Sequence, residues 1–156
     1  MEHVNHPKHY NQHPAGIECI DIIRHYTCDI ANAIKYLWRA GLKPEMGKDD
    51  AEKEIEDLEK ALWYIDDYFY EDVIRYESTS SIDYSLAMVE AATRYKPREI
   101  IEGYEARVSD AILNLLPVGI QFNGQDFSCD TWRENLNSAS KSIKQRIADI
   151  KNNIKN

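Results

Sequence analysis

Apolar residues recur every three or four positions along most of the chain, which is the spacing of amphipathic α-helices. Two short helices are predicted before Gly41, a residue type favoured just after a helix C-terminus. The apolar positions that define these two helices are Ile17, Ile20, Ile23, Tyr26, Ile30, Ala33, Ile34 and Leu37. The residues before them are polar and rich in histidine, and Pro7 and Pro14 exclude a regular helix there.

A long helix is predicted after Gly47, where Asp49 or Asp50 can cap its N-terminus. The apolar positions of this helix alternate in steps of three and four, as in a coiled coil, and they are Ile55, Leu58, Leu62, Ile65, Phe69 and Tyr76. Such a seam predicts packing against a second long helix, from this chain or from another copy. We therefore expect a homo-oligomer.

The second half of the chain predicts further helices over residues 82–95, from Lys96 onward, and from Thr131 to the C-terminus. Residues 117–129 allow a loop or a short hairpin. Since no alternating series of strands and helices is present, we predict an all-α fold: a helical bundle with a long central helix, an N-terminal His-rich loop and an amphipathic C-terminal helix. We expect residues 1–77 to form one helical module and residues 78–156 an extension that packs on it or mediates oligomerisation.

Composition and charge narrow the classes of partner. The 156 residues are 43% hydrophobic and 29% charged, as in ordinary globular proteins. The net charge of −8 repels DNA and RNA, whereas a few convergent cations can still hold a small phosphate. The sequence has no long apolar run, its first residues lack the basic start and the apolar core of a signal peptide, and its three cysteines form no C-x-x-C pair. We expect a cytoplasmic protein without a membrane partner.

The segment 32–41 carries the clearest candidate chemistry. Asn32, Lys35 and Arg39 share one helical face, flanked by Tyr36, because steps of three and four residues stack. Two more cations, Lys43 and Lys60, reach this surface if the next helix packs antiparallel. Such a face can clamp a phosphate. The alternative is a solvated face with ordinary helix ion pairs.

Aromatic residues accompany these cations and favour a nucleotide over a bare phosphate. An aromatic ring can stack on a nucleobase while lysine or arginine binds its phosphate. The rings concerned are Tyr36, Trp38, Trp63 and Tyr64, and both tryptophans could equally belong to the core. The glycine-rich phosphate-loop motif of many nucleotide-binding enzymes is missing from the sequence.

Histidines cluster near the N-terminus, and His6 and His9 bracket Pro7. An imidazole can donate to a phosphate, transfer a proton near neutral pH or bind a metal. Zinc sites usually combine histidine with cysteine or carboxylate at tight spacing, and that pattern is weak here. We expect no metal site. Glu54 and Asp57 have a spacing that could hold magnesium, and an acidic solvated face is the alternative.

Four ordered blocks resemble a phage-encoded family of small proteins that includes the early nucleotide kinase of T-odd coliphages. The blocks are Asn5-His-Pro-x-His-Tyr10, Gly16-Ile-Glu-Cys-Ile-Asp21, Asn32-Ala-Ile-Lys-Tyr-x-Trp-Arg-Ala-Gly41-x-Lys43 and Asp57-Leu-x-Lys-Ala-x-Trp-Tyr64. The resemblance covers residues 4–66 and implies a phage origin. It also implies a nucleoside monophosphate kinase, with Mg²⁺ accompanying the nucleoside triphosphate and no other cofactor. It assigns no catalytic residue.

The resemblance implies a ligand-facing set within these blocks, consisting of His6, His9, Lys35, Trp38, Arg39 and Lys60. Our first hypothesis is a nucleotide site in which Lys35 and Arg39 clamp phosphate, the two histidines donate to it, and Trp38 or Tyr10 lies near the base. The second is a non-catalytic sponge that sequesters a nucleotide immune signal, of the cyclic nucleotide or ADP-ribose type, and so blocks host anti-phage defence. A third is an inhibitor that binds a host protein through its acidic surface.

Overall fold

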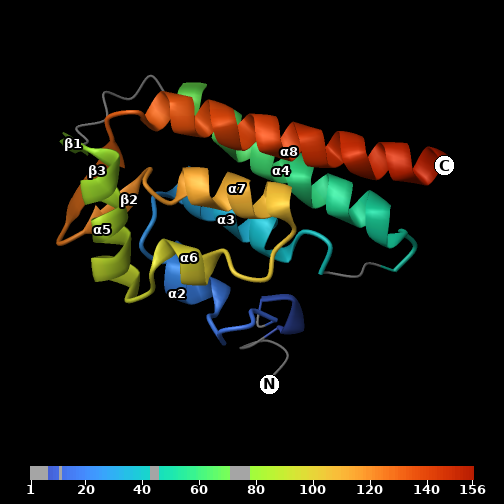
Figure 1. The fold of residues 1–156 in the computed structure, drawn as a ribbon, viewed down its shortest axis with the longest axis horizontal. Helices are drawn as coiled ribbons and strands as arrows, with labels where there is room; N and C mark the ends of the chain where they lie inside the picture. The colour runs from blue at the N-terminus through green and yellow to red at the C-terminus, as the bar shows by residue number, and fades with distance from the viewer. Residues whose placement is uncertain (1–6, 11, 43–45, 71–77) are drawn as a thin grey trace.

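The computed structural model describes residues 7–10, 12–42, 46–70 and 78–156 (Figure 1). These residues are mostly helical, as predicted, with a small sheet at one end. The elements in chain order are η1 (Lys8–Tyr10), α2 (Cys19–Ile23), α3 (Cys28–Arg39), α4 (Asp50–Tyr70), β1 (Ser78–Ser80), α5 (Ile82–Thr93), α6 (Pro97–Ile100), α7 (Ala106–Leu115), β2 (Ile120–Phe122), β3 (Gln125–Cys129) and α8 (Trp132–Lys155).

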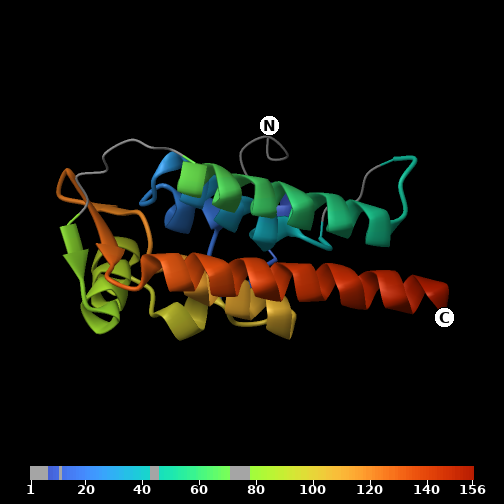
Figure 2. The same ribbon diagram turned by 90° about the horizontal axis from the view of Figure 1, so that it is seen from above.

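The two longest helices, α4 and α8, lie side by side and run in opposite directions (Figures 1 and 2). Asp49 caps α4, since its carboxylate accepts a hydrogen bond from the Glu52 backbone N–H at 2.7 Å. Leu58 and Ile65 of the predicted seam are buried, whereas Phe69 is exposed. Tyr76 lies outside the described residues. A helix of the same chain thus packs along α4, and self-association stays a prediction.

The first two helices confirm most of the predicted apolar pattern. The face of α3 is buried throughout, at Ile30, Ala33, Ile34 and Leu37. On α2, the prediction is wrong for Ile20, which is 48% exposed, because the short helix turns Ile22 into the core instead. The predicted boundary after residue 77 lies next to segment 71–77, outside the described residues.

The prediction of an all-α fold is corrected by a three-stranded sheet. Strands β2 and β3 form the hairpin that the sequence allowed. Asn123 and Gly124 turn the chain between them, both with positive φ, as two-residue hairpin turns require. The third strand, β1, pairs in parallel with β3 and was not predicted.

The helix predicted from Lys96 onward is two helices, α6 and α7, joined by a corner at Gly103. This glycine has a φ of +83°, and a Cβ on it would lie 2.4 Å from Pro14. The corner therefore brings the second half of the chain against the N-terminal loop. No helix among the described residues is long and apolar enough to cross a membrane.

Candidate functional site

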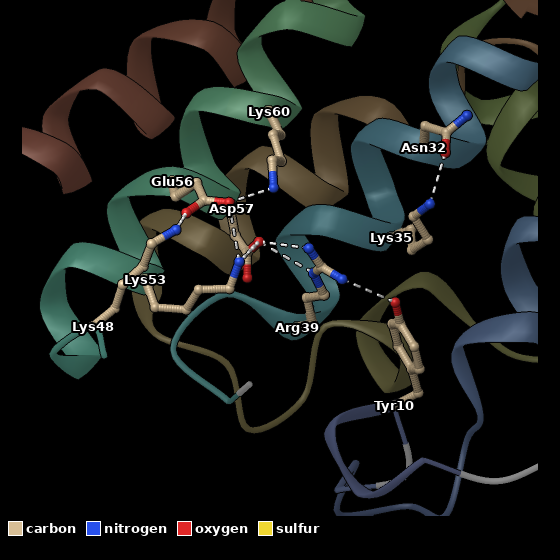
Figure 3. A network of polar contacts seen from close by, with 9 residues as sticks. All are labelled: Tyr10, Asn32, Lys35, Arg39, Lys48, Lys53, Glu56, Asp57 and Lys60. Atoms are coloured by element: carbon tan, nitrogen blue, oxygen red, sulfur yellow. Dashed lines mark hydrogen bonds and ion pairs between the residues drawn. The ribbon is translucent and has the colours of Figure 1, made fainter. Parts of the chain in front are cut away.

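Helices α3 and α4 pack against each other, which meets the condition for Lys60 to reach the surface of α3 (Figures 1 and 2). Their polar faces therefore meet in one network, which also includes a residue of the N-terminal loop. Figure 3 shows its members: Tyr10, Asn32, Lys35, Arg39, Lys48, Lys53, Glu56, Asp57 and Lys60.

A buried ion pair joins the two helices at the centre of this network. The Arg39 guanidinium donates to Oδ1 of Asp57 from Nη2 at 2.8 Å and from Nε at 3.2 Å. The Asp57 side chain is fully buried and that of Arg39 is 9% exposed. Burial lowers the pKa of Arg39, but hydrogen bonds to Asp57 and Tyr10 outweigh it and raise the pKa overall. The expectation of a displayed Arg39 is wrong, because this side chain crosses the helix interface.

A second carboxylate, that of Glu56, is surrounded by lysines. Lys53 is almost fully buried, and its ammonium lies 3.2 Å from Glu56 and 3.4 Å from Asp57. Lys48 and Lys60 also donate to Glu56. Hydrogen bonds from Lys48, Lys60 and Lys53 hold the pKa of Glu56 well below its usual range. Glu56 is therefore charged at neutral pH and meets three ammonium groups.

Three cations gather around the ring of Tyr36. The ring centroid lies 4.5 Å from Cζ of Arg39, 4.8 Å from Nζ of Lys35 and 5.6 Å from Nζ of Lys60. A second aromatic ring at this surface belongs to Tyr64 and stacks on the ring of Tyr36, with the two centroids 5.8 Å apart. These distances are within the range of cation–π interaction. The predicted combination of cations and aromatic rings is thus present at the surface around Tyr36.

Of the two tryptophans, one lies at the surface and one in the core. Trp63 is 60% exposed and meets Tyr64 edge to face. Trp38 is 1% exposed, and its indole N–H donates to the Tyr10 carbonyl at 3.2 Å. It stacks on His13 with centroids 5.4 Å apart. Trp38 therefore has no ring face open to a ligand, and the core alternative holds for it.

The remaining predicted residues are placed only in part. Asn32 accepts a hydrogen bond from Lys35 at 2.9 Å, and Lys35 makes no ion pair within the described residues. Tyr10 accepts a hydrogen bond from Arg39 at 3.4 Å, which fixes the N-terminal loop beside the network. His6 and Lys43 lie outside the described residues, as does the side chain of His9.

The buried histidine of the loop, His13, was not singled out by the sequence. Its Nδ1 accepts from the Ala15 N–H at 3.0 Å, so its Nε2 carries the proton and donates to the Ile100 carbonyl at 2.9 Å. Both ring nitrogens are thus used by the backbone. In the part of the chain that the structure describes, no group of histidine, cysteine and carboxylate side chains could hold a metal ion.

Sequence reasoning missed three parts of the site: the roles of Lys48, Lys53 and Glu56. A signal was available, because the steps of three and four from Lys53 to Glu56, Asp57 and Lys60 place all four on one face of α4. The alternative of an acidic solvated face does not hold for Glu56 and Asp57, since both carboxylates pair with lysines and Asp57 is fully buried.

A separate cavity of about 290 Å³ lies where the N-terminal loop and the end of α3 face α7 and α8. Glu54 and Arg146 line it and form an ion pair at 2.8 Å. Glu105, also on its wall, accepts hydrogen bonds from the first backbone N–H groups of α7. The ion pair of Glu54 with Arg146 thus joins α4 to α8, and Glu105 caps α7.

The fold and this network define a small, mostly helical protein with a cation-rich polar site between α3 and α4. Residues 4–66 match a family of proteins described as of unknown function, DUF3310. The match covers less than half of the chain but includes every residue of the network in Figure 3. No curated protein and no solved structure matches the chain. Since the family description names no activity, the kinase-like activity stays a prediction.

Proposed function

We propose that the α3–α4 surface binds a nucleotide, or a small molecule derived from one, through its phosphate. The observation that carries this proposal is the convergence of Lys35 and Lys60 on the ring of Tyr36. Both ammonium groups can donate charge-assisted hydrogen bonds to phosphate oxygens. The exposed ring of Trp63, next to Tyr64, offers a stacking surface for the base.

In this proposal Arg39 is a positioning residue. Its guanidinium is bound to Asp57 and packs on Tyr36, so it holds the ring and the two helices in place. Tyr10 has the same function for the N-terminal loop. A contact of His6 and His9 with the phosphate stays a prediction. We therefore assign the phosphate contacts to Lys35 and Lys60, in place of the predicted clamp of Lys35 and Arg39.

Electrostatics support an anionic ligand at this surface. The protein carries a net charge of −8, so it repels extended polyanions. At the surface itself, the ammonium groups of Lys35 and Lys60 flank the ring of Tyr36, an arrangement that suits a small phosphate ligand better than a nucleic acid polymer.

One feature of the site favours sequestration over phosphoryl transfer. A kinase needs Mg²⁺ with its nucleoside triphosphate, and carboxylates usually help to hold that ion. Glu56 and Asp57 are both occupied by cationic side chains. A non-catalytic sponge for a nucleotide immune signal, acting in the cytoplasm of a phage-infected bacterium, is therefore the second candidate beside the nucleoside monophosphate kinase.

A binding experiment tests the proposal. Isothermal titration with deoxynucleoside monophosphates, nucleoside triphosphates and cyclic nucleotides should identify a ligand of the wild-type protein. Lys35→Gln with Lys60→Gln removes two charge-assisted contacts and should weaken that ligand about 100-fold or more. Lys151→Gln with Lys155→Gln, an equal charge change on the exposed end of α8, should have little effect.

The outcomes separate the two candidates. Chromatography of the released ligand should show the starting compound for a sponge and a phosphorylated product for a kinase. Wild-type affinity in the Lys35 and Lys60 double variant would refute the site. Absence of binding by every nucleotide class to the wild-type protein would refute the proposed function itself.

A further inference from the structure

Helices α4 and α8 lie side by side on one face of the molecule, and α8 carries a row of lysines on its outer side (Figure 2). The lysines of this row are exposed and lie on one helical face, because steps of three and four residues stack. The lysine row consists of Lys141, Lys144, Lys151 and Lys155, with Ala148 at its middle position. It spans about 21 Å at a rise of about 1.5 Å per residue. The core residues Ile143 and Ile147 lie on the other side of the helix.

The outer side of α4 carries the opposite charge. Glu52 and Glu59 are exposed, and their separation of seven residues places them two turns apart on the same side of the helix. The buried Leu58 and Ala61 lie on the other side. Within the described residues, the side chains of this glutamate pair and of the lysine row make no hydrogen bond and no ion pair. These charges are therefore free to pair with another molecule.

The arrangement of the two charged rows indicates which partner fits this face. A partner with one sign of charge is attracted by one helix and repelled by the other, since both rows lie on the same face. A second copy related by a twofold axis presents its α8 to α4 and its α4 to α8, because such an interface brings the same patch of both subunits together. Each row then meets its opposite charge. The chain is thus complementary to itself at this face.

The ion pair of Glu54 with Arg146 shows how the two rows are aligned along the helices. Helices α4 and α8 run in opposite directions. Glu59 follows Glu54 by five residues, and Lys141 precedes Arg146 by five residues, so Glu59 and Lys141 lie at the same height along the helix axes. A twofold axis parallel to the helices keeps this height. It therefore places Glu59 of each copy opposite Lys141 of the other.

We propose that the face formed by α4 and α8 is an interface between two copies of this chain. In addition to the contact of Glu59 with Lys141, the same alignment places Glu52 of one copy between Lys144 and Lys151 of the other. This inference goes beyond the proposed function and does not depend on it. None of these charged side chains is assigned to the phosphate, and the assigned Lys60 lies on the side of α4 that faces α3.

The size of the face limits the strength of the dimer. Two helices side by side, each about 10 Å wide and about 30 Å long, offer about 600 Å² per copy. Stable complexes typically bury about 800 Å² per partner. Exposed ion pairs add little affinity, but they discriminate against wrong partners. We therefore expect a reversible dimer with a dissociation constant in the micromolar range, which salt weakens because it screens exposed charges.

Charge reversal tests the interface in the full chain. Sedimentation velocity at low ionic strength should show that the wild type dimerises as its concentration rises through the micromolar range. Lys144→Glu with Lys151→Glu makes both rows acidic, and Glu52→Lys with Glu59→Lys makes both basic. Each variant alone should dimerise about 100-fold more weakly than the wild type. An equimolar mixture of the two should form a dimer within about tenfold of wild-type affinity, since acidic rows then face basic rows.

A matched control separates the interface from a general effect of charge. Arg98→Glu with Arg107→Glu changes the net charge by the same amount as the double lysine variant, at exposed positions of α6 and α7. We expect this control to dimerise within about threefold of the wild type. Circular dichroism confirms that each variant is folded. Should the double lysine variant not fold, Lys144→Gln with Lys151→Gln replaces it and should dimerise about tenfold more weakly than the wild type.

Two results would overturn the inference. One is a wild-type protein that stays monomeric up to about 500 μM at low ionic strength. The other is a mixture of the two charge-reversed variants that does not associate, because pairing of α4 with α8 requires this rescue. Nucleotide titrations keep the outcome distinct from the proposed function. Nucleotide binding by a protein that stays monomeric refutes only the dimer, and a dimer that binds no nucleotide refutes only the nucleotide site.

Discussion

Replacing Asp57 with asparagine should destabilise the protein strongly. Asp57 is fully buried and its Oδ1 accepts two hydrogen bonds from Arg39, while Lys53 lies 3.4 Å away. The substitution leaves two almost buried cations without their shared carboxylate. Breaking a buried ion pair by removing one partner typically costs about 3–5 kcal/mol. Because the asparagine amide oxygen can still accept from Arg39, we expect the lower end, about 3 kcal/mol.

Urea unfolding, followed by tryptophan fluorescence and by circular dichroism, measures this loss directly. Thermal unfolding gives an independent measurement. In a chain of this size, each kcal/mol lowers Tm by about 2–4 °C, so the expected decrease in Tm is about 6–12 °C. Asp66→Asn is the matched control, since Asp66 is exposed on the same helix. A surface change of this kind should cost less than about 0.5 kcal/mol.

The result that refutes this reasoning is a loss for Asp57→Asn no larger than that for Asp66→Asn. It would mean that water or a rearranged side chain replaces the carboxylate without cost. The electrostatic link between α3 and α4 would then not determine the shape of the site. A loss of the expected size in Asp57→Asn should also lower nucleotide affinity, because Arg39 would no longer hold the Tyr36 ring.

Two further predictions concern positions outside the network. Cys28 is exposed and should react first with a thiol reagent such as Ellman's reagent. Burial raises the pKa of Cys19 to about 12 and should delay the reaction of this thiol until the protein unfolds. Equal reaction rates of the two thiols would contradict the described burial. Gly119→Ala should lower the free energy of unfolding in urea by about 3 kcal/mol, because φ is +65° and the new Cβ would lie 2.5 Å from Thr27. Gly47→Ala is the control: its φ is also positive but its surroundings are open, so it should cost only about 1 kcal/mol.

The helices were predictable because their signals are local. The apolar spacing located α3, α4 and α8, and an aspartate before α4 indicated the cap that the structure contains. The Asn123-Gly124 turn was compatible with a hairpin for the same reason. The parallel pairing of β1 with β3 was not predictable, since it joins segments almost fifty residues apart and three strand residues carry no periodic signal.

The sequence could indicate which residue types lie at the polar surface of α3 and α4, but not which side chains pair with one another. Helical steps placed Lys35 and Tyr36 together on α3, and the packing of α4 on α3, which the sequence left open, brings Lys60 beside the Tyr36 ring. They could not show that Arg39 turns toward Asp57, because the partner lies on another helix and burial depends on how the helices pack. Trp38 illustrates the same limit, since its burial follows from contacts with His13 and with the loop around Tyr10, far from it in sequence.

The second half of the chain contributes to the site without supplying any residue of the network. Helices α3 and α4 bury apolar side chains, such as Ile34 and Leu58, in the same core as Ile112 of α7 and Ile143 of α8. The matched segment 4–66 ends within α4 and leaves this core incomplete. Since a buried ion pair offsets its desolvation cost only where its geometry is held closely, the Arg39–Asp57 link depends on the packing of α3 and α4, and that packing includes contacts with α7 and α8, which the matched segment does not contain. The polar site of residues 4–66 is therefore a property of the whole fold.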